Sequence, residues 1–540
     1  MKEMDYKLKK IQDILFFLIV FCVIFDYMPK AMWLTFIGLG GPYSAMLGNY
    51  PIIAGFLLTA YMAWNGYISI WNRYVALFFV ISLVVYEVSA LHGLYIYPYW
   101  DLVLNAPEPQ IEKLPGVLSF LHNHNINISY EQLFSVWIFI RSVKAAFFQL
   151  LYSFGLSYMI YLWYKNDLKR ACEVFWSGLL AGLFVFVSYG FVDVCFLHGS
   201  SSATFILQKI NPMLHDIGKI HDWWPPLLWE GQFRSVFCEP SRVGNYIAFV
   251  LPLLFIPVIN KAKNWKYYVI LIYVISYMVF LTNARTAVAM LIGIMGLTTM
   301  MLLLFRWKDC LKRFAVIVLM VMLAFGTSIT SITIISGDCK NNNMNVSSTI
   351  TLRDKDKDKD SAAIEYLENN VGSLASTNKR SNQARYALIK SNFKIGMEHP
   401  LLGVGPLLNG AYVVEHFDDF DLQSREVQRW VKAYWKVGPL KHNFDAMNEY
   451  VTTFSTTGIL GLFCLLFPFG YGCIKLLQCI KKSSNQTVKR TLFCLFIANV
   501  SSLVVGCNGS LKLIYAIWLL LPLIYIYLTE NKEFGNEKPF

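Results

Sequence analysis

Charged residues are scarce in this chain: they make up 15% of its 540 residues, whereas hydrophobic residues make up 56% and aromatic residues 16%. A water-soluble domain contains about 25% charged residues, so this composition excludes a soluble globular protein and indicates a chain embedded in a lipid bilayer. Paired cysteines are also missing. The eleven cysteines include no C-x-x-C pair and lie mostly in apolar runs, as Cys22, Cys172 and Cys464 do. They therefore favour apolar packing over metal ligation or a disulfide framework.

Signatures of nucleotide and metal chemistry are absent as well. The chain has no Walker A loop, no dinucleotide-binding fingerprint and no H-E-x-x-H motif. The run His-Asp-Ile-Gly-Lys that begins at His215, with His221 and Asp222 after it, resembles the signature of metal-dependent HD phosphohydrolases. The connection at 197–243 is too short for that soluble domain. The basic excess of +12 lies largely in short connections, as membrane topology predicts. We therefore expect no metal, no cofactor and no nucleic-acid partner.

Apolar runs of about 20 residues recur along the whole chain, and each is long enough to cross the roughly 30 Å hydrocarbon core of a membrane. They predict an all-α polytopic membrane protein with about twelve transmembrane helices. The first run ends without a small-x-small cleavage site, so we expect a retained span. The fourth is too long for one straight crossing. The runs lie at 11–28, 52–71, 75–96, 133–164, 172–196, 245–260, 267–283, 286–305, 314–335, 447–474, 491–507 and 513–529.

The connections between these runs predict the orientation. They fall into two alternating sets, and the set that includes both chain termini holds most of the Lys and Arg residues in short connections. The excess of positive charge on the inner side of membranes places this set in the cytoplasm. The predicted organisation is transmembrane helices 1–9 at 1–335, an extracytoplasmic, mainly helical loop domain at 336–446, transmembrane helices 10–12 at 447–530 and a cytoplasmic tail at 531–540.

The loop domain begins with charge and continues with helices. The alternating Asp and Lys residues at 353–360 are typical of a solvated surface stretch. Helical spacing then predicts two helices, at 361–369 and 377–398. The pair His399 and Pro400 ends the second helix, because the residue before a proline disfavours helical backbone geometry.

Two short motifs close the loop domain. The first, Pro-Leu-Leu-Gly-Val-Gly, contains Gly403 and Gly405, which permit a tight turn. The second, His442-Asn443, comes directly before the tenth span, for which Asn443 is a candidate N-cap. An imidazole titrates near neutral pH and can accept a proton from a sugar hydroxyl. A lone histidine before a helix is, however, more often a packing or capping residue than a catalyst.

Arginines on the predicted outer face are candidates for binding phosphate. Arg285 lies in the short turn between the seventh and eighth spans, where an arginine is costly unless it is paired or functional. A guanidinium there can hold a phosphate through two parallel hydrogen bonds, or it can simply extend towards the membrane surface. Arg242 opens the sixth span, with Arg234 eight residues earlier, and its structural alternative is a salt bridge to Glu239.

A second basic pair lies at the outer part of the fourth span. Arg141 and Lys144 share one helical face, because residues three apart in a helix are neighbours. Such side chains usually extend their charged ends to the membrane surface, and they can also line a cavity.

Taken in order, these motifs resemble the bacterial O-antigen ligase and O-antigen polymerase family. The quoted residues are Glu239-Pro-Ser-Arg242, Asn283-Ala-Arg-Thr286, His399-Pro-Leu-Leu-Gly-Val-Gly405, His442-Asn443, Glu449 and Thr456-Thr-Gly-Ile-Leu-Gly461. The resemblance implies a metal-independent glycosyltransferase of surface-polysaccharide assembly in the inner (plasma) membrane, active at its extracytoplasmic face. It implies a glycan donor carried on undecaprenyl diphosphate and a glycan or lipid A-core acceptor.

The same resemblance implies roles for individual residues. Arg242 and Arg285 match the arginines that hold the diphosphate, with Arg234 as the alternative to Arg242. Arg385 matches a further basic position in the loop domain. His442 matches the base that deprotonates the acceptor hydroxyl.

Two other functions stay open from the sequence. A polysaccharide flippase or transporter often has about twelve spans, but it usually shows two related halves, and this chain has no evident repeat. A non-catalytic membrane scaffold would tolerate substitution of the arginines and the histidine. The sequence does not distinguish polymerase from ligase, because the two enzymes share a donor and differ in their acceptor.

Overall fold

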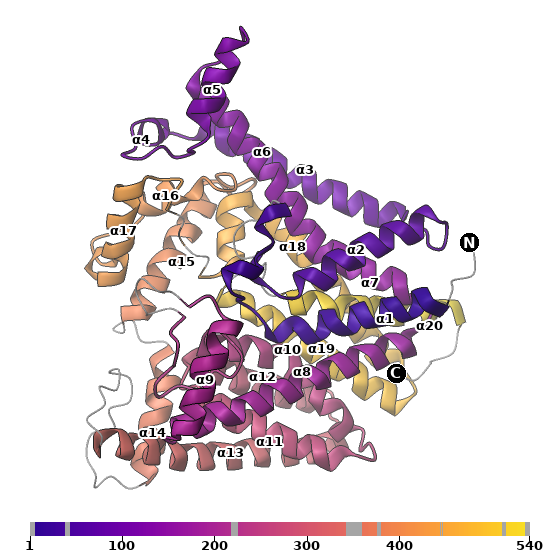
Figure 1. The fold of residues 1–540 in the computed structure, drawn as a ribbon. Coiled ribbons are helices and arrows are strands. Elements are labelled where there is room, and N and C mark those ends of the chain that lie inside the picture. Colours follow the sequence, from indigo (N-terminus) through magenta and orange to yellow (C-terminus); the bar gives the residue numbers. More distant parts are fainter. Residues whose placement is uncertain are drawn as a thin grey trace.

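The computed structural model describes residues 6–37, 44–217, 225–341, 359–374, 380–442, 444, 447–509 and 515–534. These residues form helices and no strand (Figure 1). The first half contains α1 (Tyr6–Phe21), α2 (Asn49–Trp64), α3 (Arg73–Ile96), α4 (Trp100–Leu104), α5 (Leu114–Asn123), α6 (Tyr130–Leu150), α7 (Leu156–Tyr164), α8 (Leu168–Leu197) and α9 (Ser201–Leu214). The second half contains α10 (Pro240–Ile259), α11 (Trp265–Leu281), α12 (Arg285–Leu304), α13 (Lys308–Asn341), α14 (Lys359–Asn370), α15 (Arg380–Glu398), α16 (Asn409–Glu415), α17 (Arg425–Val437), α18 (Glu449–Lys482), α19 (Gln486–Val504) and α20 (Leu520–Phe534).

Each of the twelve predicted spans corresponds to a helix or a run of helices. Eight described segments are long and apolar enough to cross a membrane, and 265–281 and 515–530 are shorter apolar helices. α1 and α2, at the positions of the first two predicted spans, have 16 residues each. The prediction of an all-helical protein is therefore confirmed, whereas the number of twelve crossings stays a prediction.

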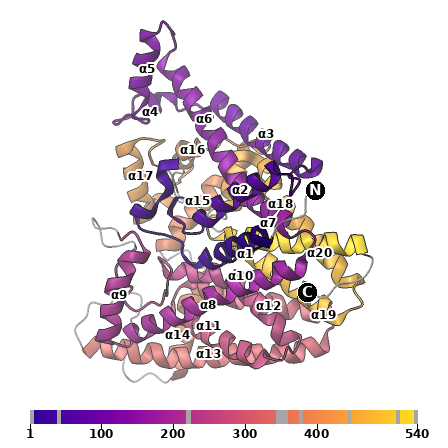
Figure 2. The same ribbon diagram turned by 45° about the vertical axis from the view of Figure 1, so that its right-hand side comes forward.

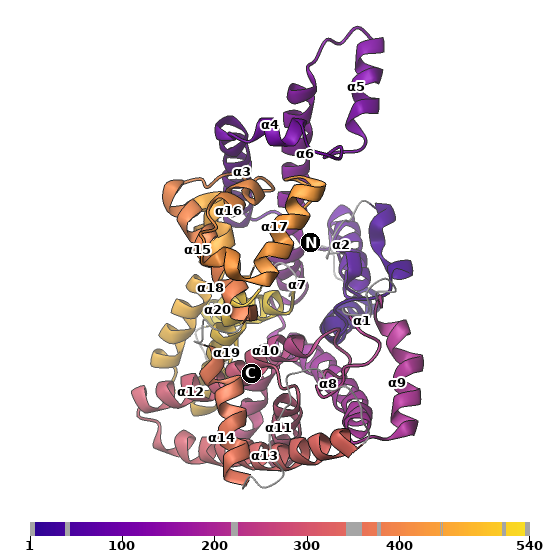
Figure 3. The ribbon, with the colours of Figure 1, turned by 90° about the vertical axis from the view of Figure 1, so that its left-hand side faces the viewer.

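The helix bundle has two ends, which are distinguished by the segments that they carry. At one end, Arg170 in the first turn of α8 pairs with Asp13 of α1 at 2.9 Å, and Glu530 of α20 accepts a hydrogen bond from the backbone N–H of Leu168 at 2.7 Å. We call this the terminus end. The opposite end carries α14 to α17 and the first turns of α10 and α12, and we call it the loop end (Figure 1). In Figure 3, which faces the loop end, α14, α15 and α17 cross this face.

The centre of the bundle is formed by α10 and α19, which pack against each other. In α10, 83% of the apolar span is buried within the molecule, and in the span that contains α19 the share is 72%. The corresponding value for α3 is 22%, because α3 lies at an edge of the bundle. Figures 1 and 2 show α13 at one edge and α3 at the opposite edge. The first turn of α10 therefore starts from the middle of the loop end.

The long fourth run forms one continuous helical segment of 35 residues, Tyr130–Tyr164. A π-helical turn at Leu151–Gly155 separates α6 from α7. At 1.5 Å per residue the segment is about 50 Å long, well beyond the roughly 30 Å hydrocarbon core. The outer part of α6 therefore projects beyond one membrane thickness.

The helices α14 and α15 lie where helical spacing predicted them, but the predicted N-cap of α18 is not the one observed. α14 covers the first predicted helix. α15 begins at Arg380 within the second, whose first residues 377–379 lie outside the described residues, and it ends at Glu398, directly before His399 and Pro400. α18 begins at Glu449, where the Asn448 side chain accepts hydrogen bonds from the backbone N–H groups of Tyr450 and Val451. Asn443 is therefore not the N-cap of α18, and that prediction is wrong. Asn443 itself and the charged run at 353–358 lie outside the described residues.

Candidate active site

The first turns of α10 and α12 lie side by side at the loop end. Gly244 of α10 packs so closely on α12 that a Cβ atom at position 244 would come within 2.6 Å of the Ala287 Cα atom. A larger residue at 244 would push the two helices apart. Arg242 and Arg285 each stand two residues before this contact, so the two arginines open neighbouring helices at the same level.

Arg285 and Arg385 bring two positive charges near each other at the loop end. The Arg285 Nη1 donates to Oδ1 of Asn382 at 2.6 Å, and Arg385 donates to Oδ1 of Asn508. The two guanidinium groups are close enough to repel each other. Among the described residues, neither of them has a carboxylate partner. Two like charges held together by neutral amide oxygens make a site that an anion would stabilise.

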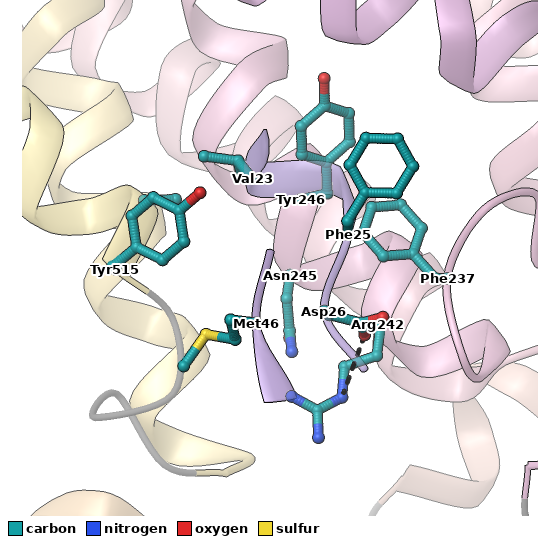
Figure 4. A pocket seen from close by; sticks show the side chains of 10 residues that line it. Val23, Phe25, Asp26, Met46, Phe237, Arg242, Asn245, Tyr246 and Tyr515 are labelled. Atoms are coloured by element: carbon teal, nitrogen blue, oxygen red, sulfur yellow. Dashed lines mark ion pairs between the residues drawn. The ribbon is translucent and has the colours of Figure 1, made fainter. Parts of the chain in front are cut away.

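Arg242 lines a separate pocket of about 450 Å³, a volume that includes the space at its mouth. Its Nε atom lies 3.3 Å from Oε1 of Glu239 and 4.0 Å from Oδ2 of Asp26, which follows α1. The predicted salt bridge to Glu239 is thus present, and a second carboxylate adds to it. In Figure 4 the terminal guanidinium nitrogens extend past Asp26, in the same direction as the amide of Asn245. Arg242 can therefore offer its terminal nitrogens while both carboxylates hold its Nε.

Arg234, the alternative to Arg242, is buried and tied to the backbone. The residue is only 2% exposed. Its guanidinium group donates hydrogen bonds to the carbonyl oxygens of Pro226, Leu227 and Cys238 at 2.9–3.4 Å. Its backbone N–H donates to Asp193 at 2.8 Å. Burial lowers the pKa of Arg234 from its ordinary value. These contacts fix the connection before α10, and of the two arginines it is Arg242 that lines a pocket.

The turn after α15 is fixed to α18 by backbone hydrogen bonds. Gly403 and Gly405 have φ values of 65° and 87°, a region that favours glycine. The N–H of Val404 donates to the carbonyl of Ser455 at 2.9 Å, and the N–H of Gly405 donates to that of Thr456 at 3.0 Å. The turn is therefore joined to α18 by hydrogen bonds between the two backbones.

α18 is interrupted where this turn meets it. Gly458 has φ 64° and ψ −166°, which is not helical, and the N–H of Ile459 donates to the carbonyl of Pro400 at 2.8 Å. A Cβ atom at position 458 would overlap the backbone of Leu401. A Cβ atom at Gly93 of α3 would likewise overlap the Val404 carbonyl. The turn is thus held between α3 and the break in α18.

His442 lies in the connection between α17 and α18, at the loop end. Its ring packs edge-on against Phe444, with 5.1 Å between the ring centroids, and its backbone N–H donates to Gly438 at 3.2 Å. Phe444 in turn packs against Phe417, which follows α16, and against Trp430 and Tyr434 of α17. Through Phe444, His442 packs on an apolar cluster formed by residues of α3 to α6 and of α15 to α17, which we call the loop-domain cluster. The apolar cluster that contains α10 and α12 is a separate one.

The helix α15 connects these two clusters. Ala384 and Leu388 pack inside the loop-domain cluster, while Arg385 reaches Asn508 after α19. The structure thus brings Arg285 and Arg385 into one site, sets Arg242 on the adjacent helix and places His442 in the neighbouring loop cluster.

Several residues of this site were missed by the sequence reasoning. Asn382 lies three residues before Arg385, a helical spacing that could have marked it as a neighbour. Gly458 belongs to the quoted Thr456–Gly461 motif, but the helix break at this position was not expected, although a glycine inside an apolar span weakens a helix. Asp26 and Asn508 carry only the weak signal of a polar residue at the end of an apolar run.

His215 is the first residue of the histidine motif that resembled a phosphohydrolase, and it is buried. His215 is 2% exposed, and burial lowers its pKa to about 3, so the imidazole is held neutral. Lys219, His221 and Asp222 lie outside the described residues. Within the described ranges, no group of three or more His, Cys, Asp or Glu residues is arranged to hold a metal ion.

Fold and site together define a multi-pass membrane protein with an arginine-rich site at one end of its helices. Residues 267–466 match a family model described as O-antigen ligase. The match confirms the resemblance found in the motifs over that segment, which is similar to O-antigen ligases. The matched segment includes Arg285, Arg385 and His442, whereas Arg234 and Arg242 precede it. No curated protein and no solved structure matches the chain.

Proposed function

We propose that this protein is an integral-membrane glycosyltransferase that moves a glycan from undecaprenyl diphosphate to a hydroxyl group of an acceptor. The loop end would face the extracytoplasmic side of the plasma membrane. The O-antigen ligase match over 267–466 supports the reaction class. The acceptor is a second lipid-linked glycan in a polymerase and a lipid A core in a ligase, and the proposed chemistry is the same for both.

The observation that carries the proposal is the Arg285–Arg385 pair. Two guanidinium groups lie close together at the start of a membrane helix, bound to amide oxygens. Such an arrangement is costly without an anion, since both charges repel each other in a partly desolvated site. A diphosphate at the membrane surface supplies that anion, and Arg242 on the adjacent helix adds a third donor to the same end.

The reaction follows from the charge that develops during transfer. The acceptor oxygen attacks the anomeric carbon of the donor glycan, and the bond from that carbon to the diphosphate oxygen breaks. His442 accepts the proton of the acceptor hydroxyl. The negative charge that builds on the departing undecaprenyl diphosphate is stabilised by Arg285, Arg385 and Arg242. A single displacement of this kind inverts the anomeric centre.

The test is replacement of Arg285 or Arg385 by Ala and of His442 by Ala. We expect each arginine variant to lower polymer or conjugate formation about 10²–10³-fold, the usual effect of removing one donor to a developing charge. The histidine variant should lower it about 10²–10⁴-fold, the usual contribution of a positioned base. The measurement is glycan transfer by the purified protein in nanodiscs, with the lipid-linked repeat unit as donor.

Arg429→Ala is the matched control, because Arg429 is an exposed residue of the same loop domain. It should leave transfer unchanged. Full activity in all three test variants would exclude the assigned roles. Movement of the lipid-linked glycan across proteoliposomes without formation of a new glycosidic bond would instead support a transporter.

A further inference from the structure

A second and larger pocket opens at the edge of the loop end, outside the arginine site. It measures about 1020 Å³ including its open mouth and lies between the outer part of α6, the segment before α5 and the connection after α17. Its lining includes Lys113, Trp137, Ile140, Arg141, Lys144 and Lys441. Figure 3 shows α5 and α6 at one edge of the loop end.

The charge of this pocket is mainly positive. Lys441 is already paired with Glu108 at 3.0 Å and with Glu112 at 3.5 Å. Arg141 and Lys144 are exposed, and within the described residues neither has an acidic partner. Lys113, on the facing wall, is also exposed and also has no acidic partner among the described residues. Three cationic groups from two separate elements thus line one pocket, and its one lining carboxylate, Glu112, is paired with Lys441.

The basic pair lies at the level of lipid headgroups. The α6–α7 segment ends at Tyr164 towards the terminus end, and one membrane crossing takes about 20 residues. Counting back from Tyr164 leads to Lys144, so Arg141 and Trp137 occupy the next turns outwards. A tryptophan beside basic residues is typical of a membrane–water interface.

Exposed apolar residues border the pocket and distinguish a lipid from a free ion. Ile140 lines it and is 56% exposed, and Val136, one turn away on α6, is 48% exposed. A soluble phosphate gains nothing from such a border, whereas a lipid chain covers it and removes apolar area from water.

We propose that this pocket binds the phosphate-bearing headgroup of a lipid in the outer leaflet, and that this lipid is the carrier of the acceptor glycan. The second part rests on the function proposed above. Lys441 lines the pocket and is the direct neighbour of His442 in the chain. The acceptor carrier would therefore be held beside the base, while the donor diphosphate is held by the arginines of α12 and α15.

The experiment counts bound carrier lipids by native mass spectrometry of the full-length protein released from nanodiscs. The probe is undecaprenyl phosphate in a phosphatidylcholine background. The wild type should retain two copies, one at each proposed site. Arg141→Gln with Lys144→Gln should retain one, and Lys113→Gln on the opposite wall should lower the occupancy of the second copy several-fold. Arg285→Ala with Arg385→Ala should also retain one copy.

The matched control is Arg429→Gln with Lys432→Gln, an exposed Arg/Lys pair at the same spacing on α17. This control should retain two copies. Equal loss in the control, or two copies in the Arg141/Lys144 variant, would overturn the proposal. Displacement of the second copy by inorganic pyrophosphate at equal concentration would identify a free-anion site instead and would also overturn it.

Transfer kinetics test the assigned role of the lipid. The Arg141/Lys144 variant should raise the KM for the lipid-linked acceptor about tenfold and leave kcat near the wild-type value. Loss of the second lipid copy with an unchanged KM would refute the role as acceptor carrier. If the His442 variant were also fully active, the proposed function would fail while the lipid site itself would stand, because lipid counting does not depend on catalysis.

Discussion

The backbone of α18 is not helical at Gly458, and the turn at 400–405 forms hydrogen bonds with α18 at this break. The interruption leaves backbone groups of α18 without helical partners. The turn at 400–405 satisfies them with the N–H groups of Val404 and Gly405 and with the carbonyl of Pro400, which accepts from the N–H of Ile459. Buried backbone groups need such partners, because an unpaired one costs free energy comparable to a lost hydrogen bond. The break and the turn therefore stabilise each other.

Replacing Gly458 by Ala should release the turn at 400–405 from α18. The backbone geometry at 458 costs a residue with a side chain about 1–3 kcal/mol, and overlap with Leu401 adds to this. We expect faster hydrogen exchange at Val404 and Gly405 and a large loss of glycan transfer. Gly470→Ala in the same helix is the control, since nothing lies within 4 Å of a Cβ atom there. Unchanged exchange in the Gly458 variant would refute the coupling.

Arg234 and Arg242 are the same residue type in the same connection, but the structure places them in different surroundings. Both are arginines in the same predicted outer connection, and each was a candidate to bind the diphosphate. The structure separates them by burial: three backbone carbonyls surround the guanidinium of Arg234, while Arg242 lines a pocket. The difference arises from neighbours such as Asp26, which lies more than two hundred residues earlier in the chain. Sequence spacing does not encode such contacts.

The helix α15 connects the arginine site to the loop helices. Its Asn382 and Arg385 face the membrane helices, and its Asn392 accepts a hydrogen bond from Ser455 of α18 at 2.7 Å. Lys390 pairs with Asp418 and with the buried Asp421, both at 2.6 Å. This cation lowers the pKa of Asp418 well below its ordinary value. α15 therefore depends on Lys390 for its attachment to the segment before α17.

Lys390→Met should destabilise the loop domain by roughly 3 kcal/mol, because it leaves a buried carboxylate without its counter-ion. Lys394→Met, one turn further along α15 on an exposed position, should have little effect. The measurement is the rate of limited proteolysis within α15 to α17. Equal protease resistance of the two variants would show that the ion pairs do not hold this helix.

The connection after α15 also carries an acid-sensitive group. Partial burial and the neighbouring His92 lower the pKa of His399 from its ordinary value, while Glu398 opposes the shift and His416 adds to it. The ring of His399 packs against those of His92 and Tyr412. The unfolded loop therefore binds a proton more readily than the folded loop as the pH falls through the ordinary histidine pKa.

Stability of this turn should consequently be complete above about pH 7 and should decline as the pH falls below about 6.5. His399→Phe keeps the aromatic packing and removes the titrating group, so it should weaken this dependence. Thermal unfolding between pH 7.5 and 5.5 measures it. The same decline in the variant as in the wild type would assign the acid sensitivity to other groups.

For the whole molecule, both described chain ends share one side with the α7–α8 connection, and the loop helices occupy the other. The positive-inside distribution then predicts that the terminus end faces the cytoplasm. Green fluorescent protein fused after Phe534 should fluoresce, and alkaline phosphatase fused after Leu374 should be active. Fluorescence and phosphatase activity appearing at the reverse positions would invert the topology and exclude an extracytoplasmic site.

The sequence by itself determined the helices, the family and most of the candidate residues. Apolar runs as long as a membrane is thick allow hardly any structure but helices, and short motifs carry the chemistry of their side chains. Only the tertiary structure decided which arginines face each other, where α18 breaks and which asparagine caps it. Those outcomes depend on contacts between segments far apart in the chain, such as Arg285 with Asn382 and Gly458 with Leu401, which packing selects and local sequence does not specify.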